Sequence, residues 1–298
     1  MVEVELSQVA LPNGENVAYR GREGGEKVVL LIHGNMTSSK HWDLLMDVLD
    51  SQYKLYAIDL PGFGESTYHN EIRSIRDLSK TVKQFIEALG LEPYALIGWS
   101  MGGAVSLQYC ADYDHPCEKL VLLASGSTRG FPFYGTGSDG LPDLSHRLKT
   151  LHEVRQDTGK TQAVQGAYDR QDKEFLKMMW NQLIYVHNQP DEVKYDEYLN
   201  DMLTQRNLAE IYQALNIFNI SHQHNGLSDG TGEVDQIDIP VLVMRGENDL
   251  VVTEPMTNEL LEDLGERATF KLLESCGHSP LVDDLKQLRH TIEDFLTN

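Results

Sequence analysis

The sequence of 298 residues has few cysteines and no apolar run long enough to cross a bilayer, which takes about 20 residues. No membrane span is therefore expected. The three cysteines, Cys110, Cys117 and Cys276, leave one odd thiol and do not suggest a disulfide framework. The first residues, Met1 to Glu5, are acidic and alternating, unlike the basic and apolar parts of a signal peptide. We expect a cytoplasmic protein with reduced thiols.

Basic residues are scarce relative to acidic ones. The chain has 25 Lys and Arg against 46 Asp and Glu, which gives a formal charge of −21. A surface of this sign repels nucleic acids and anionic membranes, so neither is expected as a partner. A well-solvated acidic surface is favoured over adaptation to salt or attraction of cationic substrates. The sequence leaves the oligomeric state open.

Motifs for nucleotides and metals are also missing. There is no G-x-x-x-x-G-K-[ST] loop and no dinucleotide-binding fingerprint, so neither ATP nor NAD is implied. His222 and His224 are two residues apart, but no carboxylate or cysteine spacing completes a metal site. We expect a protein that uses no cofactor and no metal.

What is present is an alternation of short apolar runs with amphipathic segments. Val2–Ala10 and Asn16–Arg20 predict a β-hairpin around an Asn-Gly turn. Apolar residues recur at helical spacing from Ile72 to Leu89, and this helix should end at Gly90. Continuous apolar runs predict strands buried on both faces of a parallel sheet: Val28–Ile32, Leu55–Ile58, Tyr94–Ile97, Leu120–Ala124, Val241–Met244 and Thr269–Leu273. The order predicts an α/β sandwich with eight strands, mostly parallel, and flanking helices.

The alternation stops between Ser127 and Asp235. Residues 126–140 are rich in glycine, proline and aromatics and are predicted as a loop, and residues 143–219 are predicted to be mostly helical. The polar stretch 222–233 is predicted as a hinge. We therefore expect a core domain formed by residues 1–126 and 236–298, with residues 127–235 inserted as a helical cap or lid over the site.

Residues 98–102, Gly-Trp-Ser-Met-Gly, are the most informative segment. They follow the apolar run Tyr94–Ile97 and precede a predicted helix, residues 103–113. A strand that turns sharply into a helix places the central Ser100 in a strained conformation, which requires small residues two positions away on each side. The Ser100 hydroxyl would then project from the carboxyl edge of the sheet, near a helix N-terminus. Ser100 is the predicted nucleophile.

A serine nucleophile needs a base, and the base needs an orienting carboxylate. Asp249 follows the strand Val241–Met244, and His278 follows the last strand, so both loops should reach the edge that carries Ser100. The rival acid Glu247 should point elsewhere in its turn, and residues 125–128, after the sixth strand, contain no carboxylate. The predicted triad is Ser100, His278 and Asp249.

An oxyanion hole would complete the site. The loop His33-Gly34-Asn35-Met36 follows the strand Val28–Ile32, where the amide of Asn35 can face the nucleophile. The amide of Met101 supplies the second donor. The Asn35 side chain is a further candidate donor, whereas His33, at the end of a buried strand, is interpreted as a scaffold residue.

Four motifs together resemble the α/β-hydrolase fold over nearly the whole chain. They are the loop at His33, the segment 59–66 (D-L-P-G-F-G-E-S), the turn at Ser100, and the segments at Asp249 and His278. The resemblance implies that segment 59–66 is structural and borders the pocket. The G-W-S-M-G-G turn resembles that of esterases, lipases and related bacterial hydrolases. The first loop is also similar to that of haloalkane dehalogenases and epoxide hydrolases, which carry aspartate at the position of Ser100. That difference argues against opening of alkyl halides or epoxides.

The predicted function is a cofactor-free serine hydrolase of small carboxylic esters, acting through an acyl-enzyme. A thioesterase, a lactonase, a C–C bond hydrolase or a perhydrolase would use the same triad, and a small-molecule receptor with a hydrolase fold is the alternative from another class. Trp99, Trp180 and Tyr185 are candidates for the substrate pocket, although Trp180 and Tyr185 could equally form the packing face of the cap.

Overall fold

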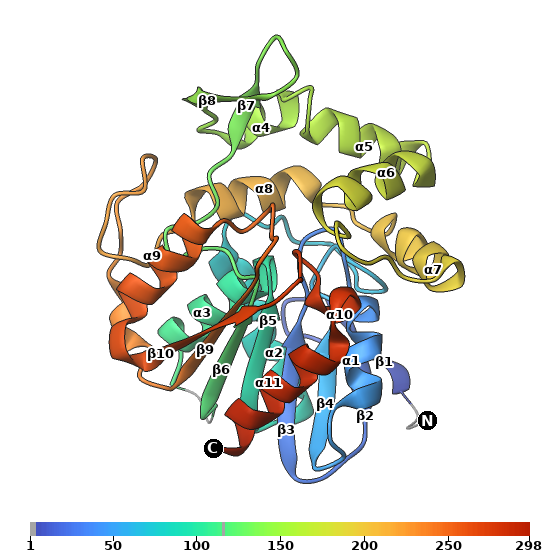
Figure 1. Ribbon diagram of the computed structural model, residues 1–298, viewed down its shortest axis with the longest axis vertical. Helices are drawn as coiled ribbons and strands as arrows, with labels where there is room; N and C mark the ends of the chain where they lie inside the picture. Colours follow the sequence, from blue (N-terminus) through green and yellow to red (C-terminus); the bar gives the residue numbers. More distant parts are fainter. Residues whose placement is uncertain (1–3, 115–116) are drawn as a thin grey trace.

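The centre of the molecule is an eight-stranded sheet with the order β1-β2-β4-β3-β5-β6-β9-β10 (Figure 1). The computed structural model describes residues 4–114 and 117–298. The pairs β1–β2 and β2–β4 are antiparallel and the others are parallel. The strands are β1 (Val4–Ala10), β2 (Asn16–Arg22), β3 (Lys27–Ile32), β4 (Tyr53–Ile58), β5 (Pro93–Trp99), β6 (Lys119–Leu123), β9 (Val241–Gly246) and β10 (Ala268–Leu273). The predicted sheet is confirmed, and the predicted start of its first strand at Val2 lies outside the described residues.

One expectation about the sheet is wrong. β10 was expected to be buried on both faces, but Thr269, Phe270 and Lys271 are all exposed. The reason is position, because β10 is the last strand in the order and has only β9 beside it. A strand at the edge of a sheet lacks a neighbouring strand on one side, so its side chains are less covered than those of a central strand.

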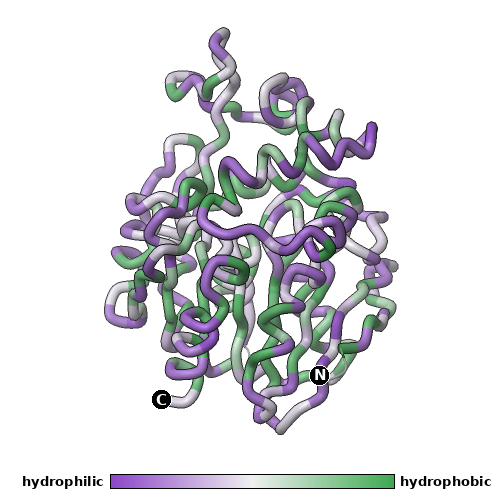
Figure 2. The backbone as a smooth tube through the Cα atoms, turned by 45° about the vertical axis from the view of Figure 1, so that its right-hand side comes forward, coloured by the Kyte–Doolittle hydropathy of each residue, from purple (hydrophilic) through white to green (hydrophobic). Residues whose placement is uncertain are grey.

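The two faces of the sheet are covered by different helices. Leu31 in β3 belongs to a core cluster with residues of α1 (Asp43–Val48) and α11 (Leu285–Thr297). Its neighbours Leu30 and Ile32 belong to a second cluster on the opposite face, as the period of two in a strand requires. That cluster includes residues of α2 (Ile75–Leu89), α3 (Met101–Asp112) and α9 (Glu254–Leu264). In Figure 2 the apolar colour gathers along these central strands.

The ends of α2 follow from its sequence. Ser74 and Asp77 form a capping box at the N-terminus, and Gly90 ends the helix with φ 61°. A left-handed residue at a helix C-terminus is favourable for glycine, which has no Cβ. The predicted end at Gly90 is therefore confirmed, and the helix begins three residues after the expected start at Ile72 because the cap lies at Ser74.

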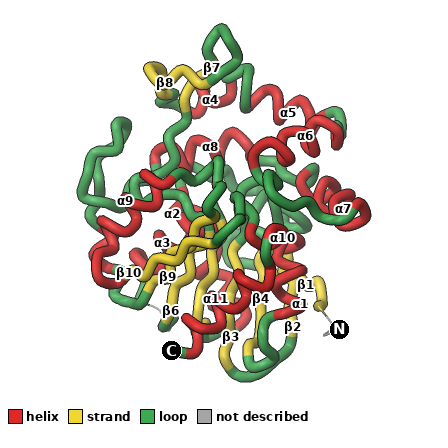
Figure 3. The backbone as a smooth tube through the Cα atoms, viewed as in Figure 1, coloured by secondary structure: helices red, strands yellow, loops and turns green. Residues whose placement is uncertain are grey.

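Between β6 and β9 the chain leaves the sheet for residues 124–240, which we call the insertion. Figures 1 and 3 show it above the sheet, at the end of the molecule away from the chain termini. It contains β7 (Tyr134–Thr136), β8 (Pro142–Arg147), α4 (Leu151–Gln156), α5 (Thr161–Asp169), α6 (Lys173–Leu183), α7 (Glu192–Met202) and α8 (Leu208–Ile217). The hairpin of β7 and β8 was not predicted, since residues 126–140 were expected to form a loop and residues 143–219 to be mostly helical. Most of β8 is exposed, so it has no buried face to produce an apolar pattern.

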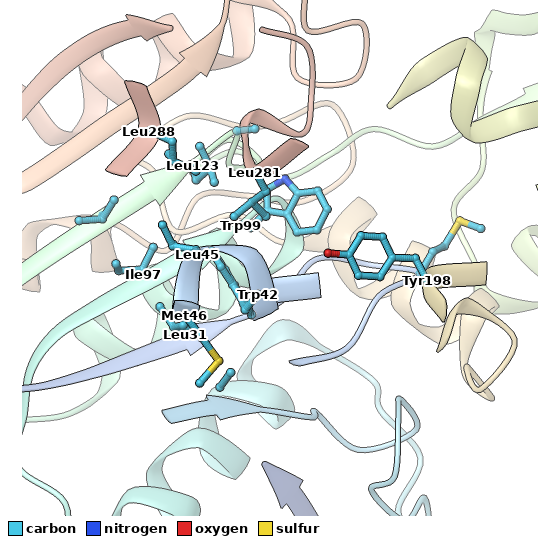
Figure 4. Close-up of a cluster of buried hydrophobic side chains, with 14 of the residues drawn as sticks. Leu31, Trp42, Leu45, Met46, Ile97, Trp99, Leu123, Tyr198, Leu281 and Leu288 are labelled. Carbon is cyan, nitrogen blue, oxygen red and sulfur yellow. The ribbon is translucent and has the colours of Figure 1, made fainter. Parts of the chain in front are cut away.

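The insertion packs directly on the rest of the chain. Ile211 and Ala214 of α8 belong to the same core cluster as residues of α2 and α3. On the other face, Tyr198 of α7 joins the cluster that holds Trp42 and Trp99 (Figure 4). The Tyr198 hydroxyl also donates a 2.6 Å hydrogen bond to Asp43 at the start of α1. Apolar and polar contacts therefore both hold the insertion in place.

No helix among residues 4–114 and 117–298 has the length and apolar character needed to span a membrane. The same part of the chain holds no group of three or more His, Cys, Asp or Glu side chains placed to bind a metal ion.

Candidate active site

Ser100 lies at the turn between β5 and α3, with φ 55° and ψ −116°. This is a conformation that a residue with a side chain rarely adopts. The turn is possible because its two flanking glycines carry no Cβ. A Cβ on Gly98 would collide with the carbonyl of Gly102, and a Cβ on Gly102 would collide with the carbonyl of Ile32. The sharp turn at Ser100 and the close packing of β3, β5 and α3 around it therefore both depend on the missing Cβ atoms of Gly98 and Gly102.

Three side chains form a continuous line at this turn. His278 Nε2 lies 3.1 Å from Ser100 Oγ, and His278 Nδ1 lies 2.9 Å from Asp249 Oδ2. Ser100 comes from the end of β5, Asp249 from the loop after β9, and His278 from the loop after β10. All three loops follow parallel strands and so leave the sheet at the same edge.

The backbone around this line holds the carboxylate and the imidazole. Asp249 Oδ1 accepts hydrogen bonds from the amides of Val251 and Val252, at 2.8 and 2.9 Å. The indole of Trp99 donates to the carbonyl of His278 at 2.9 Å. The side chains of Asp249 and His278 are almost fully buried, at 0% and 4% exposed. Burial with these partners fixes the orientation of both groups.

The rival acids do not reach His278. Glu247, two residues before Asp249, accepts a 3.0 Å hydrogen bond from the amide of Ser275 instead. After β6, Ser125 donates to the carbonyl of Gly126, and this loop supplies no carboxylate.

The loop after β3 lies against the serine turn. A Cβ placed on Gly34 would lie 3.2 Å from Ser100 Cβ, so the backbone of this loop passes next to the nucleophile. The backbone amides of Asn35 and Met101 have no hydrogen-bond acceptor among the described residues. Two unpaired amides beside a serine hydroxyl can stabilise an oxyanion that forms on an attacked carbonyl.

His33 is part of the support of this loop. Its Nε2 accepts a hydrogen bond from the amide of Leu60 at 3.0 Å, and its Nδ1 lies 2.7 Å from the carbonyl of Gly34. An imidazole that accepts at Nε2 and donates at Nδ1 is neutral. Complete burial lowers the pKa of His33 to about 4. His33 therefore remains neutral at pH 7, as a scaffold residue would.

A cavity of about 170 Å³ opens above Ser100, between the serine turn and the insertion. Most of the described side chains that line it are apolar, and none of them is a lysine, arginine, aspartate or glutamate. The lining residues are Gly34, Asn35, Met36, Trp99, Ser100, Met179, Trp180, Leu183, Ile184, Tyr212, Val251 and His278.

Two of the three pocket candidates line this cavity, Trp99 and Trp180, whereas Tyr185 does not. The ring of Tyr185 packs edge-on behind Trp180, at 5.2 Å between centroids, and against Tyr195 at 5.3 Å. Ile184, the residue before Tyr185, lines the cavity instead.

Several lining residues were missed by sequence analysis. Leu183 and Ile184 follow Trp180 by three and four positions, so helical spacing from Trp180 would have pointed to them. Tyr212 and Val251 come from other parts of the chain, and nothing in the local sequence identifies them.

These features define a hydrolase-type α/β protein with a serine at the turn after its central strand. The alpha/beta hydrolase fold family matches residues 27–285, so the chain belongs to this family.

The sequence identity between this chain and individual relatives is low. It is 25% identical to a 2-hydroxy-6-oxononadienedioate/2-hydroxy-6-oxononatrienedioate hydrolase of Paraburkholderia phymatum, over 94% of this chain and 90% of that protein. It is 24% identical to the human monoacylglycerol lipase ABHD6, over 94% of this chain and 78% of that protein. Among solved structures, an esterase from Exiguobacterium antarcticum has a TM-score of 0.74 at 18% identity, covering 98% of this chain and 99% of that one. The last similarity concerns the fold alone.

Proposed function

We propose that this protein is a cofactor-free serine hydrolase of small carboxylic esters. The observation that carries the proposal is the line of hydrogen bonds from Ser100 through His278 to Asp249, at the floor of an apolar cavity. A serine hydroxyl is a weak nucleophile at neutral pH, and a histidine oriented by a carboxylate activates it.

In the proposed mechanism, Ser100 Oγ attacks the ester carbonyl while His278 Nε2 takes its proton. Asp249 holds the imidazole by Nδ1–H and stabilises the imidazolium that forms. The amides of Asn35 and Met101 donate to the oxyanion. His278 then returns the proton to the departing alcohol, which leaves an acyl-Ser100 ester. Water attacks this ester with His278 again as the base, and the carboxylic acid is released.

In this proposal the insertion covers the site as a cap, and residues 127–235 form the cap. Trp180 and Ile184 of the insertion face the same cavity as Ser100, which supports this role. A cap of this kind excludes water and holds the acyl group in place. The three cysteines are free and buried, which supports a cytoplasmic location.

The lining of the cavity favours an uncharged substrate. The name of the Paraburkholderia phymatum relative describes a dicarboxylate, which carries two negative charges. Binding such a group in a cavity of low polarity requires a cationic partner. No lysine or arginine is among the described residues that line this cavity. We therefore favour an ester with an apolar acyl group over C–C bond cleavage in a dicarboxylate.

A substrate panel tests this proposal. Wild-type protein is assayed with p-nitrophenyl esters of graded acyl length, with lactones and thioesters, and with a 2-hydroxy-6-oxo-dienedioate. Ser100→Ala should reduce ester turnover by about 10⁴–10⁶-fold, because the triad acts as a unit. Ser145→Ala, at an exposed serine of β8, is the matched control and should be unchanged. Preferred turnover of the dienedioate would contradict the ester assignment, and sub-stoichiometric turnover of every substrate would favour a receptor.

Covalent labelling tests the nucleophile separately. An activated serine should react with an uncharged p-nitrophenyl phosphonate, and the mass of the adduct should map to the peptide that contains Ser100. Labelling of a different serine, or of none in active protein, would contradict the acyl-enzyme mechanism.

A further inference from the structure

Segment 59–66 has no part in the proposed mechanism, yet a chain of hydrogen bonds leads from it to Asn35. The chain begins at the carbonyl of Pro61, which accepts a 2.8 Å hydrogen bond from Asn207 Nδ2. A carbonyl oxygen only accepts, so the amide nitrogen of Asn207 must face Pro61. The Oδ1 of Asn207 consequently faces the other way, toward Gln205.

Gln205 connects the side chain of Asn207 to that of Asn35. Its Nε2 donates to Asn207 Oδ1 at 3.2 Å and to Asn35 Oδ1 at 2.8 Å, which uses both of its hydrogens. Its Oε1 accepts a 3.1 Å hydrogen bond from the hydroxyl of Tyr168. Since Nε2 of Gln205 is a donor, the Asn35 atom that meets it must be the oxygen. The carbonyl of Pro61 thereby decides which way the side-chain amide of Asn35 is turned.

This orientation leaves the Nδ2 of Asn35 available. Asn35 lines the cavity together with Ser100 and His278. Its Nδ2 has no hydrogen-bond acceptor among the residues that the structure describes. Asn35 is half-buried, so its free N–H₂ can donate to a group that enters the cavity, and such a hydrogen bond is strengthened in surroundings of low polarity. Next to the serine turn, the group that gains acceptor strength during reaction is the oxygen of the attacked carbonyl.

We propose that Gln205 is a positioning residue, which holds the side chain of Asn35 so that its Nδ2 donates to the substrate oxygen that becomes negatively charged. This inference rests on the proposed function, because it assumes attack by Ser100 on a carbonyl. Gln205 lies in the insertion, between α7 and α8, so the insertion contributes to the chemistry as well as to the pocket.

The segment that carries Gln205 is firmly attached to segment 59–66. The amide of Arg206 donates to the carbonyl of Gly62 at 2.9 Å, and the amide of Gly64 donates to Thr204 Oγ1 at 2.8 Å. Gln205 itself is 4% exposed. A group held at this many points costs little reorganisation when the transition state forms.

Gln205→Glu reverses the orientation with almost no change of shape. A carboxylate at position 205 has no hydrogen to donate and accepts instead, so the side chain of Asn35 must turn its Nδ2 toward it. The donor is then lost from the cavity. Loss of one oxyanion donor costs about 10²–10³-fold in kcat. We expect a fall of about 100-fold in kcat with KM little changed. Gln205→Met, which keeps the volume and leaves Asn35 unanchored, should give a smaller fall.

A double-mutant cycle separates this role from a structural one. Asn35→Ala should lower kcat by about as much as Gln205→Glu, and Gln205→Glu introduced into the Asn35→Ala protein should have no further effect. If Gln205 merely supported the fold, the two losses would multiply, and that result would overturn the proposal. Gln162→Glu, an exposed position on α5, controls for the added negative charge and should match wild type.

The same cycle is measured with a second readout, the rate at which the uncharged p-nitrophenyl phosphonate labels Ser100. The phosphoryl oxygen develops charge as the carbonyl oxygen does, so the same pattern of losses is expected. If wild type labels at Ser100 but hydrolyses no ester, the substrate assignment fails while the labelling rates still decide the role of Gln205. Labelling rates that are equal in wild type and Gln205→Glu would overturn the role of Gln205 and leave the proposed function intact. Absence of labelling at Ser100 would overturn both.

Discussion

Among single residues, His33 shows how burial determines the charge of a side chain. It is completely buried beneath the first loop, and both of its nitrogens have backbone partners that suit a neutral ring. A charged imidazole at this position would lose its hydration and would lose the hydrogen bond from the amide of Leu60. The loop that carries Asn35 therefore depends on an uncharged His33.

This dependence predicts an effect of pH on stability. The pKa of His33 is lowered from 6.5 to about 4 in the folded protein, so the unfolded chain takes up this proton first as the pH falls. The stabilisation is fully present above pH 6.5 and is lost between pH 6.5 and about 4. Its size is about 3 kcal/mol. The free energy of unfolding in urea is measured at several pH values across this range. Between pH 6.5 and about 4 it should fall by about 3 kcal/mol more in wild type than in His33→Gln. Parallel curves for the two proteins would contradict the assignment of a neutral, buried His33.

At the scale of elements, the contact between β5 and α3 decides whether Ser100 is presented at all. The strand and the helix meet through Gly98 and Gly102, and the backbone of Gly102 also lies against the end of β3. The first turn of α3 is thereby placed directly behind the nucleophile. A small displacement of this helix would move Ser100 Oγ away from His278 Nε2.

Gly102→Ala should therefore damage both stability and activity. The new Cβ would overlap the carbonyl of Ile32, which belongs to a central strand and has little freedom to move. Overpacking of this kind costs about 1–3 kcal/mol, and ester turnover should fall more than 10-fold because the turn is displaced. Thermal unfolding and initial rates measure the two effects. Gly126→Ala is the control: a Cβ there has no heavy atom within 4 Å, and its behaviour should match wild type.

At the scale of the whole molecule, two separate parts of the chain meet around one cavity. The sheet contributes Ser100 and His278, and the insertion contributes an apolar face of α6 that includes Met179 and Trp180. Selectivity can therefore change at this face of α6 without any change at Ser100. Substitutions on this face should alter which acyl groups the proposed esterase accepts, whereas loss of Ser100 should abolish turnover of all of them.

Trp180→Ala should shift the preference of the proposed esterase toward longer acyl groups, because the indole side of the cavity is removed. Each methylene accommodated in an apolar pocket is worth about 1–3 kcal/mol, so the ratio of kcat/KM for long and short esters should rise about 10- to 200-fold. Rates on a series of p-nitrophenyl esters measure this ratio. Leu144→Ala, on the exposed hairpin of β7 and β8, should leave the ratio unchanged. An unchanged profile in the Trp180 variant would mean that the core loops alone bind the acyl group.

The sequence by itself determined the sheet, the helix α2 with its end at Gly90, and the order of the functional segments. Buried parallel strands are apolar throughout, and a serine between two glycines after such a strand has few conformations open to it. The positions of Asp249 and His278 after strands were enough to predict that they meet Ser100, and the structure places them within hydrogen-bond distance.

Only the tertiary structure decided which side chains face the cavity and which lie behind it. Ile184 and Tyr185 are neighbours in sequence, but packing against Trp180 and Tyr195 turns Tyr185 away. The exposure of β10 was missed because an apolar run does not show whether a strand lies at the edge of the sheet. The hairpin of β7 and β8 was missed because its exposed strand β8 carries no apolar pattern. The chain of hydrogen bonds from Pro61 to Asn35 could not be predicted from the sequence for a further reason. Residues 61, 205 and 35 meet only after the insertion has folded onto the core, and the orientation of an amide depends on partners far away in the chain.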